Sequence, residues 1–161
     1  APAWGSTPDE GALRITRHDP DNGSEDIALT AQAEAPQIAA SIEEPTVRSG
    51  ESATLTQTVS NEATEAAVLE AQITSTPDFL TLEGASVTSG SGTVGGQSLT
   101  LQPGAEAEVQ YSFQETVQST RTFDGTISHE TNDPEAASPF NLDVSVTVEA
   151  AQMTVSVQEV G

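Results

Sequence analysis

Hydrophobic and polar residues alternate with a period of two along most of the chain, and helical periodicity is weak. Runs rich in Thr, Val and Ser are separated by Gly and Pro, which is typical of short strands joined by turns. "AEAEVQYSF" is the clearest case, because Val109, Tyr111 and Phe113 fall on one face of the expected strand. "SATLTQTVSNEAT" places Leu55 and Val59 on one face in the same way.

The alternation continues through the second half of the chain. "AAVLEAQITSTPDF" favours a strand over a helix, because Ile73 and Thr74 are followed by Pro77. Further strands are expected in "TLEGASVTSGSGTVGGQSLTLQPG", "FDGTISHE" and "FNLDVSVTVEA". Short strands at intervals of about 8 to 12 residues predict an all-β fold, an antiparallel β-sandwich.

A comparison of the chain with itself shows an internal repeat. "GALRITRHDPDNGSEDIALTAQAEAPQIAASIEE" aligns with "GTISHETNDPEAASPFNLDVSVTVEAAQMTVSVQE" in the same order. Gly11 matches Gly125, and the Asp-Pro pair at 19–20 matches the pair at 133–134, both 114 residues apart. After a loop of different length, "QIAASIEE" matches "QMTVSVQE" 115 residues apart. A fixed period of this kind is the signature of a repeat architecture.

The repeat predicts how the chain is divided. Residues 1–35 correspond to the terminal hairpin of an incomplete unit, 36–149 to a complete sandwich and 150–161 to the first strand of a further unit. Met153 occupies the repeat position of Ile38, which predicts a core-facing strand position. The apolar residues of the outer segments are expected to form assembly strands: Leu13, Ile15, Ile27, Leu29, Met153, Val155 and Val157.

Acidic residues dominate the charge. The 161 residues include 25 Asp and Glu against 4 arginines and no lysine, for a net charge of −21. With 35% hydrophobic residues, this charge fits either a disordered chain or a folded protein that works in concentrated salt. Salt of about 1 M shortens the Debye length to roughly 3 Å and screens the repulsion between carboxylates. Because the acids are dispersed rather than gathered into a tail, we favour the halophilic surface.

The same composition argues against several kinds of partner. Nucleic acids and anionic membrane surfaces both require clustered Lys or Arg, so neither is expected to bind. No apolar stretch reaches the roughly 18 residues of a spanning helix, so no membrane span is expected. The N-terminal "APAWGSTPDEG" does not have the pattern of a signal peptide, although one removed before residue 1 would leave the same sequence. Cysteine is absent from the sequence, which excludes disulfides and thiolate chemistry.

Several turn residues carry a family resemblance. "VRSGESATLTQTVSNEATEAAVLEAQI", "SLTLQPGAEAEVQYSF" and "FDGTISHETNDPEAASPFNLDVSVTVEA" contain, in order, a Ser-Asn turn, a Pro-Gly turn at 103–104 and an Asn-Asp-Pro turn. In this order the chain resembles the immunoglobulin (Ig)-like modules of the ASH/HYDIN/major-sperm-protein-like group. The first strand lacks the usual Phe-Gly, and His18 stands where an Asn usually precedes Asp19. The resemblance implies a seven-stranded Ig-like sandwich, with partial units here at both ends, used as a repeated spacer or docking module without catalytic residues.

Candidates for catalysis and metal binding are few. His18 and His129 are not equivalent in the repeat, and no nucleophile-elbow pattern occurs, so neither an enzyme nor a cofactor is expected. The loop "HDPDNGSED" offers Asp19, Asp21 and Asp26 as oxygen ligands of the kind Ca²⁺ prefers, although without the EF-hand order. The alternative is a hairpin loop in which Pro and the Asp side chains stabilise the turn.

The same loop contains Asn22 in "NGS", the sole N-glycosylation sequon of the sequence. Glycosylation at Asn22 is a hypothesis for a secreted protein, and Asn-Gly is also simply a favourable turn.

Together these features predict a non-enzymatic structural building block of an extracellular surface, filament or virion assembly in a high-salt environment. Subunits or repeats would be joined through their terminal strands, because unpaired strand edges recruit further strands. One alternative is an excerpt of a longer tandem-repeat surface protein. Another is a soluble carbohydrate- or protein-binding β-sandwich module, which predicts a cluster of exposed aromatic side chains. Host, specific ligand and assembly symmetry do not follow from the sequence.

Overall fold

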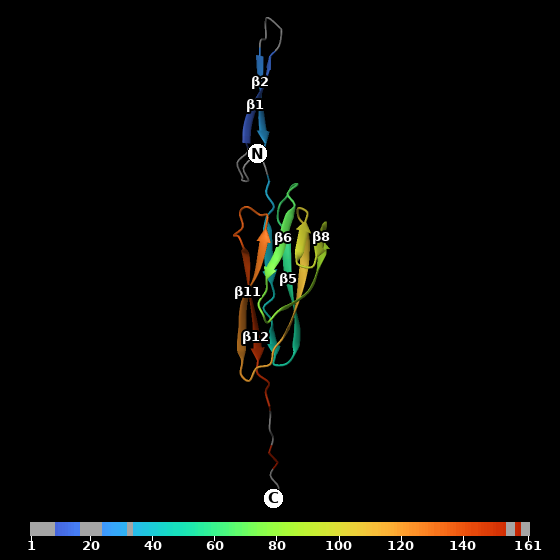
Figure 1. The fold of residues 1–161 in the computed structure, drawn as a ribbon, viewed down its shortest axis with the longest axis vertical. Coiled ribbons are helices and arrows are strands. Elements are labelled where there is room, and N and C mark those ends of the chain that lie inside the picture. The colour runs from blue at the N-terminus through green and yellow to red at the C-terminus, as the bar shows by residue number, and fades with distance from the viewer. Residues whose placement is uncertain (1–8, 17–23, 32–33, 154–156, 159–161) are drawn as a thin grey trace.

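The computed structural model describes residues 9–16, 24–31, 34–153 and 157–158, the first two ranges by their backbone (Figure 1). All the regular elements in these ranges are strands, so the predicted all-β fold is confirmed. None of the described residues belongs to a helix with the length and apolar character needed to cross a bilayer.

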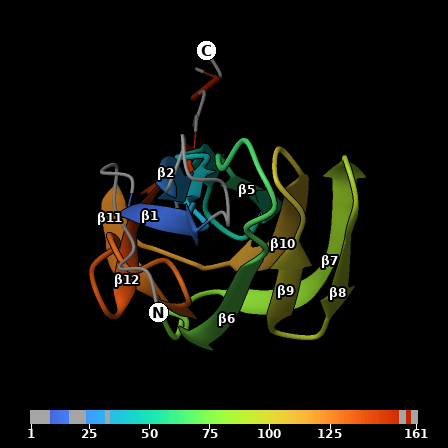
Figure 2. The ribbon, with the colours of Figure 1, turned by 90° about the horizontal axis from the view of Figure 1, so that it is seen from above.

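The strands between residues 38 and 149 form two sheets packed face to face (Figure 2). The first sheet has the order β3 (Ile38–Ile42), β5 (Ser52–Asn61), β10 (Glu106–Gln114) and β7 (Thr81–Ser89). The second has the order β4 (Thr46–Arg48), β12 (Phe140–Glu149), β11 (Arg121–Thr131), β6 (Leu69–Ser75), β9 (Ser98–Leu101) and β8 (Gly92–Gly95). The predicted sandwich is therefore confirmed.

Two details differ from the expectation. The pair β4–β12 is parallel, whereas the other described pairs are antiparallel. The two sheets also contain more strands than the seven that the resemblance implies, because the Gly/Ser-rich segment folds into the additional hairpin β8–β9. A further strand arises at Pro45, which separates β3 from β4: the chain leaves the first sheet there and joins the second. Since Pro has no N–H to donate to a ladder, a strand break at this position is expected.

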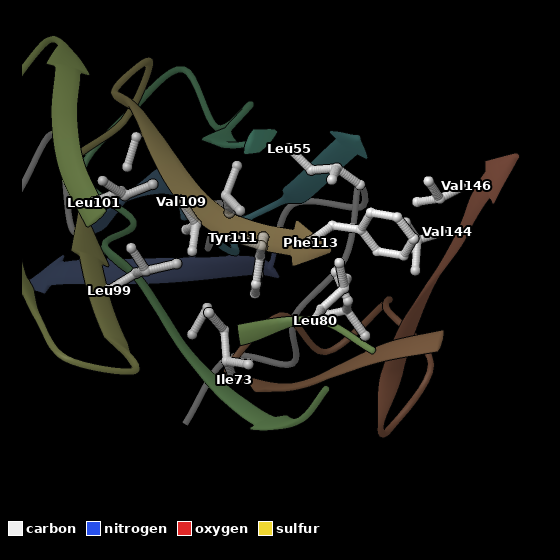
Figure 3. Close-up of a cluster of buried hydrophobic side chains, with 14 of the residues drawn as sticks. Leu55, Ile73, Leu80, Leu99, Leu101, Val109, Tyr111, Phe113, Val144 and Val146 are labelled. Atoms are coloured by element: carbon white, nitrogen blue, oxygen red, sulfur yellow. The ribbon is translucent and has the colours of Figure 1, made fainter. Parts of the chain in front are cut away.

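Alternation places the core between the sheets as predicted. In β10, Val109, Tyr111 and Phe113 are buried and point toward the facing sheet (Figure 3). In β5, Leu55 and Val59 are fully buried. The second sheet contributes buried aliphatic side chains from four strands: Leu69, Ile73, Leu99, Leu101, Ile127, Val144, Val146 and Val148.

One end of the core is aromatic. The rings of Phe79, Phe113 and Phe123 lie with centroids 5.7–6.0 Å apart, in edge-on or tilted arrangements that aromatic quadrupoles favour. Pro77 packs directly against the backbone of Gly125 in β11: a Cβ at Gly125 would lie 2.7 Å from Pro77 Cβ and 3.1 Å from the Phe79 ring. A side chain cannot be accommodated there without moving the loop between β6 and β7.

The Pro-Gly turn at the opposite end has the geometry its sequence predicts. The Ala105 N–H donates to the Gln102 carbonyl at 3.0 Å, and Gly104 between them has φ of +72°. Pro followed by a residue with positive φ defines a type II turn, which needs Gly at that position. This turn leads into β10, where the alternation of buried residues begins.

The remaining two strands form a separate hairpin. β1 (Asp9–Thr16) and β2 (Ser24–Ala31) pair antiparallel, in a two-stranded sheet of their own. In Figure 1 this hairpin lies beyond one end of the sandwich, and the chain leaves the sandwich at the other end, after β12.

Candidate assembly site

The β1–β2 hairpin is the first part of the predicted assembly site. Its register places Leu13 opposite Ile27 and Leu29 opposite Gly11, and Ile15 follows two positions after Leu13. Within the described ranges, neither strand pairs with a third strand. The outer edges of β1 and β2 therefore offer main-chain N–H and C=O groups for which these ranges supply no strand partner.

The repeat mate of this hairpin has very different neighbours. β11 pairs with β6 on its other side, and β12 pairs with β4 on its other side. The two hairpins have matching sequence patterns, but β11–β12 lies within the six-stranded sheet and β1–β2 forms a sheet of its own.

Residues Glu34–Ile38, here termed the clamp segment, connect the hairpin to the sandwich. They form hydrogen bonds with the end of the sandwich that lies nearer the hairpin. Oε1 of Glu34 accepts hydrogen bonds from the N–H and the hydroxyl of Thr64, at 2.7 and 2.9 Å. The carbonyl of Gln37 accepts a hydrogen bond from the N–H of Glu62 at 2.8 Å. Both partners belong to the loop that follows β5, so this loop fixes the position where the chain enters the sandwich.

Asn61, the Asn of the Ser-Asn turn, is the buried centre of this end. Its Nδ2 donates to the carbonyls of Ala67 and Leu101 at 2.8 and 3.1 Å. Its Oδ1 accepts from the N–H groups of Gln37 and Ala63, both at 3.2 Å. All four hydrogen-bonding positions of the amide are therefore used. The sequence marked this residue as a turn landmark, but its long-range role required the structure.

Asp133 of the Asp-Pro loop joins the clamp segment to the β11–β12 hairpin. Its Oδ1 accepts from the N–H groups of Glu135 and Ala136 at 2.9 and 3.3 Å, and its Oδ2 accepts from the N–H of Ile38 at 2.9 Å. The carboxylate thus stabilises its own turn and holds the first residue of β3. This structural role matches the turn interpretation of the Asp-Pro repeat at Asp133; its mate Asp19 lies outside the described residues.

The other candidates in the first loop are only partly covered. Asp19, Asp21 and the sequon residue Asn22 lie outside the described residues. Asp26 lies in β2, opposite Arg14 of β1. In the described ranges no three Asp, Glu or His side chains gather in a group that could hold a metal ion. The calcium and glycosylation hypotheses therefore stay predictions.

A buried polar cluster inside the sandwich was not predicted. The Tyr111 hydroxyl donates to Gln57 Oε1 at 2.7 Å, and Gln57 Nε2 lies 2.8 Å from His129 Nε2. Gln57 donates in this second contact, so His129 carries its proton on Nδ1, for which the described residues provide no hydrogen-bond partner. Burial lowers the pKa of His129, and the backbone of Phe140 opposes this effect in part. Burial also raises the pKa of Tyr111. One feature of the sequence could have indicated this cluster: the polar residue Gln57 stands in β5 at a position where the alternation predicts a buried apolar side chain.

The C-terminal part of the assembly site is exposed. Met153 and Val157 are 86% and 89% exposed and belong to no strand, so the core-facing strand position predicted for Met153 in a further unit is not formed within the described residues and stays a prediction. Their repeat mates Ile38 and Ile42 pack against the core of the unit that they begin. No described residue provides such a core beside Met153. Val155 lies outside the described residues.

Exposed aromatic side chains, which the binding-module alternative predicts, are not found among the described residues. Tyr111 and Phe113 are fully buried, and Phe79, Phe123 and Phe140 are half-buried. The described surface therefore gives that alternative no specific support.

Comparisons with known proteins find two weak structural similarities. No family model and no curated protein matches the chain, so the resemblance to the ASH/HYDIN/major-sperm-protein-like group stays a prediction. The chain is similar to a protein of unknown function from Porphyromonas gingivalis W83, with 14% identity and a TM-score of 0.43, over 89% of this chain and 66% of that one. It is also similar to domains 4 and 5 of the S-layer protein SbsC, with 14% identity and a TM-score of 0.37, over 89% and 59%. The chain thus spans less than two thirds of either structure, and neither similarity carries an argument about this chain.

Proposed function

We propose that the chain is a non-enzymatic structural module of an extracellular surface, filament or virion assembly, in which Ig-like units are joined through their terminal strands. One observation carries the proposal. The β1–β2 hairpin pairs only with itself within the described ranges, whereas its repeat mate β11–β12 is flanked by strands on both sides. A further strand at either edge of β1–β2 would satisfy its main-chain groups in the same way.

The charge of the chain supports the high-salt setting of the proposal. A net charge of −21 on 161 residues repels other copies at low ionic strength. Salt at molar concentration screens this repulsion within roughly 3 Å, so that copies can approach one another. Assembly is therefore expected to increase with salt concentration.

Multi-angle light scattering after size-exclusion chromatography tests this function, over a concentration series at about 0.1 M and about 3 M NaCl. The expected result is a mass that grows with protein concentration in high salt, with electron microscopy showing filaments or particles. A variant with Leu13→Asp and Leu29→Asp is expected to abolish the growth. Gln118→Asp with Ser119→Asp, in the exposed loop before β11, adds the same charge and is expected to leave assembly unchanged.

A monomer at every salt and protein concentration would contradict the proposal. So would equal loss of assembly in the two double variants, because the effect would then come from charge alone and not from the hairpin.

A further inference from the structure

The residues that end β12 repeat the clamp segment. Glu149–Met153 has the sequence "EAAQM", against "EAPQI" in Glu34–Ile38, and the match continues with "TVSVQ" against "AASIE". The separation of 115 residues is the one already found for this part of the repeat. The structure shows how the first copy binds the sandwich that follows it, and the second copy has the same groups for binding a sandwich in the same way.

In the first copy, each polar group has a partner on the sandwich that follows it. Glu34 binds the N–H and hydroxyl of Thr64, the N–H of Gln37 donates to Asn61, and the N–H of Ile38 donates to Asp133. Pro36 is buried. After this point β3 pairs antiparallel with β5, from Ile38 opposite Asn61 to Ile42 opposite Gln57.

In the second copy, the same groups face solvent. The side chain of Glu149 is exposed, as are Ala151, Gln152 and Met153. The carbonyl of Glu149 accepts a hydrogen bond from the N–H of Ser49 at 2.8 Å, so its backbone belongs to the sandwich that ends there. Only residues 150–152 lie between this backbone anchor and Met153, so the Cα atoms of Glu149 and Met153 are at most about 14 Å apart.

We propose that Glu149–Met153 is a second clamp segment, which binds one further Ig-like sandwich as Glu34–Ile38 binds the first. The receiving sandwich presents the free edge of a strand equivalent to β5. That strand ends in an Asn, a hydroxyl residue follows three positions later, and an Asp-Pro aspartate lies beside it. Glu149 then serves two units, with its backbone closing one sandwich and its carboxylate capping a loop of the next. This inference rests on the proposed function, because it specifies how joined units contact each other.

Two fusion chains of equal length test the inference. The test fusion is residues 1–158 followed directly by residues 44–149, so that "EAAQMTVSVQ" supplies the clamp and first strand of a second sandwich. The control fusion is residues 1–148 followed by residues 34–149, which supplies "EAPQIAASIE" instead. The two chains differ only within this ten-residue segment.

Calorimetry of the test fusion is expected to give about twice the unfolding enthalpy of the natural chain's sandwich, as for the control fusion, because enthalpy scales with folded length. Glu149→Ala in the test fusion is expected to lower the melting midpoint of one sandwich by about 4 °C, the shift that a loss of about 1 kcal/mol gives in a domain of this length. In the natural chain the same substitution is expected to shift the midpoint by less than about 1 °C, because an exposed side chain without partners is removed.

Three results would overturn the inference. The first is a test fusion with the enthalpy of one sandwich beside a control with two, and the second is Glu149→Ala without effect in a folded test fusion. The third is a control that also holds one sandwich, because the clamp would then not transfer between units. Failure of the proposed function is distinguishable, since it appears as a natural chain that stays monomeric in concentrated salt.

Discussion

The β1–β2 and β11–β12 hairpins share a sequence pattern and differ in everything that surrounds them. Gly11 lies opposite Leu29 in the first, and its mate Gly125 lies opposite Val144 in the second. At the separation of 115 residues found for this part of the repeat, Val144 aligns with Leu29, so the two hairpins have the same register. The same register keeps matching side chains on the same face, because strands alternate with period two. The one-residue difference between the two copies therefore lies in the loop and leaves the strand pairing unchanged.

The comparison separates what a hairpin determines by itself from what its unit supplies. Alternation and an Asp-Pro loop are present in both copies, and both form antiparallel pairs. Burial and edge pairing come only from strands distant in sequence, namely β6 and β4 for the second copy. Paired substitutions at matching positions of the two hairpins therefore measure the contribution of the surrounding unit.

The largest difference is expected at the glycine of each first strand. Gly125→Val is expected to lower the free energy of unfolding of the sandwich by about 3 kcal/mol, because the new side chain overlaps Pro77 and Phe79. Gly11→Val, the matched control, is expected to change it by less than about 0.5 kcal/mol, because β1 pairs with no strand of the sandwich. Urea denaturation followed by circular dichroism measures both. Equal losses would show that the two hairpins share one packing environment.

The aspartates of the two Asp-Pro loops give the next largest contrast. Asp133→Asn is expected to cost about 2 kcal/mol, because an amide has a single oxygen and cannot accept from both the turn and Ile38. Asp19→Asn is expected to leave the sandwich unchanged. Hydrogen exchange of the Ile38 amide provides a local measurement, with faster exchange expected in the Asp133 variant alone. Unchanged protection there would contradict the assigned role of Asp133.

The glutamates of the two clamp segments, Glu34 and Glu149, are expected to differ in their contribution to stability. Glu34→Ala is expected to lower the melting temperature of the natural chain by an amount equivalent to about 1 kcal/mol, through loss of two hydrogen bonds to Thr64. Glu149→Ala is expected to cost nearly nothing in this chain. Thr64→Ala combined with Glu34→Ala completes a double-mutant cycle, and strict additivity of the two losses would argue against the contact.

The smallest effect concerns His129, whose repeat mate is Ile15. Burial lowers the pKa of His129, so the unfolded chain binds a proton at higher pH than the folded one. The stability contributed by the neutral ring is complete above the unfolded pKa of about 6.5 and is lost as the pH falls from there through the folded pKa. His129→Ile is expected to remove this part of the pH dependence between about pH 7.5 and 5.5. The measured quantity is the slope of the free energy of unfolding against pH, because the loss of the hydrogen bond to Gln57 lowers stability equally at every pH. An unchanged slope would contradict the lowered pKa of His129.

Much of the fold follows from local pattern. The alternation in β5 and β10 identified their buried faces, since the apolar positions recur with the period that a half-buried strand requires. The parallel pairing of β4 with β12 did not follow, because it depends on where the chain crosses between sheets at Pro45. The buried Gln57 and His129 were missed for a similar reason, since they are 72 residues apart and meet only across the core.

The candidate site itself stays a prediction. The repeat pointed to the terminal segments and the Asp-Pro loops as its parts, because both depend on residues close in sequence. The network around Asn61 joins residues from 37 to 101 and has no short motif. Met153 was placed in a core by analogy with Ile38, but burial depends on a partner that the alignment of one segment does not supply.

The parallel pair β4–β12 has a mechanical consequence. The chain enters the sandwich at one end and leaves it at the other, so a force that pulls on the two connections draws β3–β4 and β12 in opposite directions along their axes. Residues Thr46–Arg48 face Thr147–Glu149 in register, and under this loading their bonds share the force and must break together. Antiparallel ends opened from one side would instead unzip one bond at a time. In a row of units joined as proposed, β4 would thus make each sandwich resist stretching along the row.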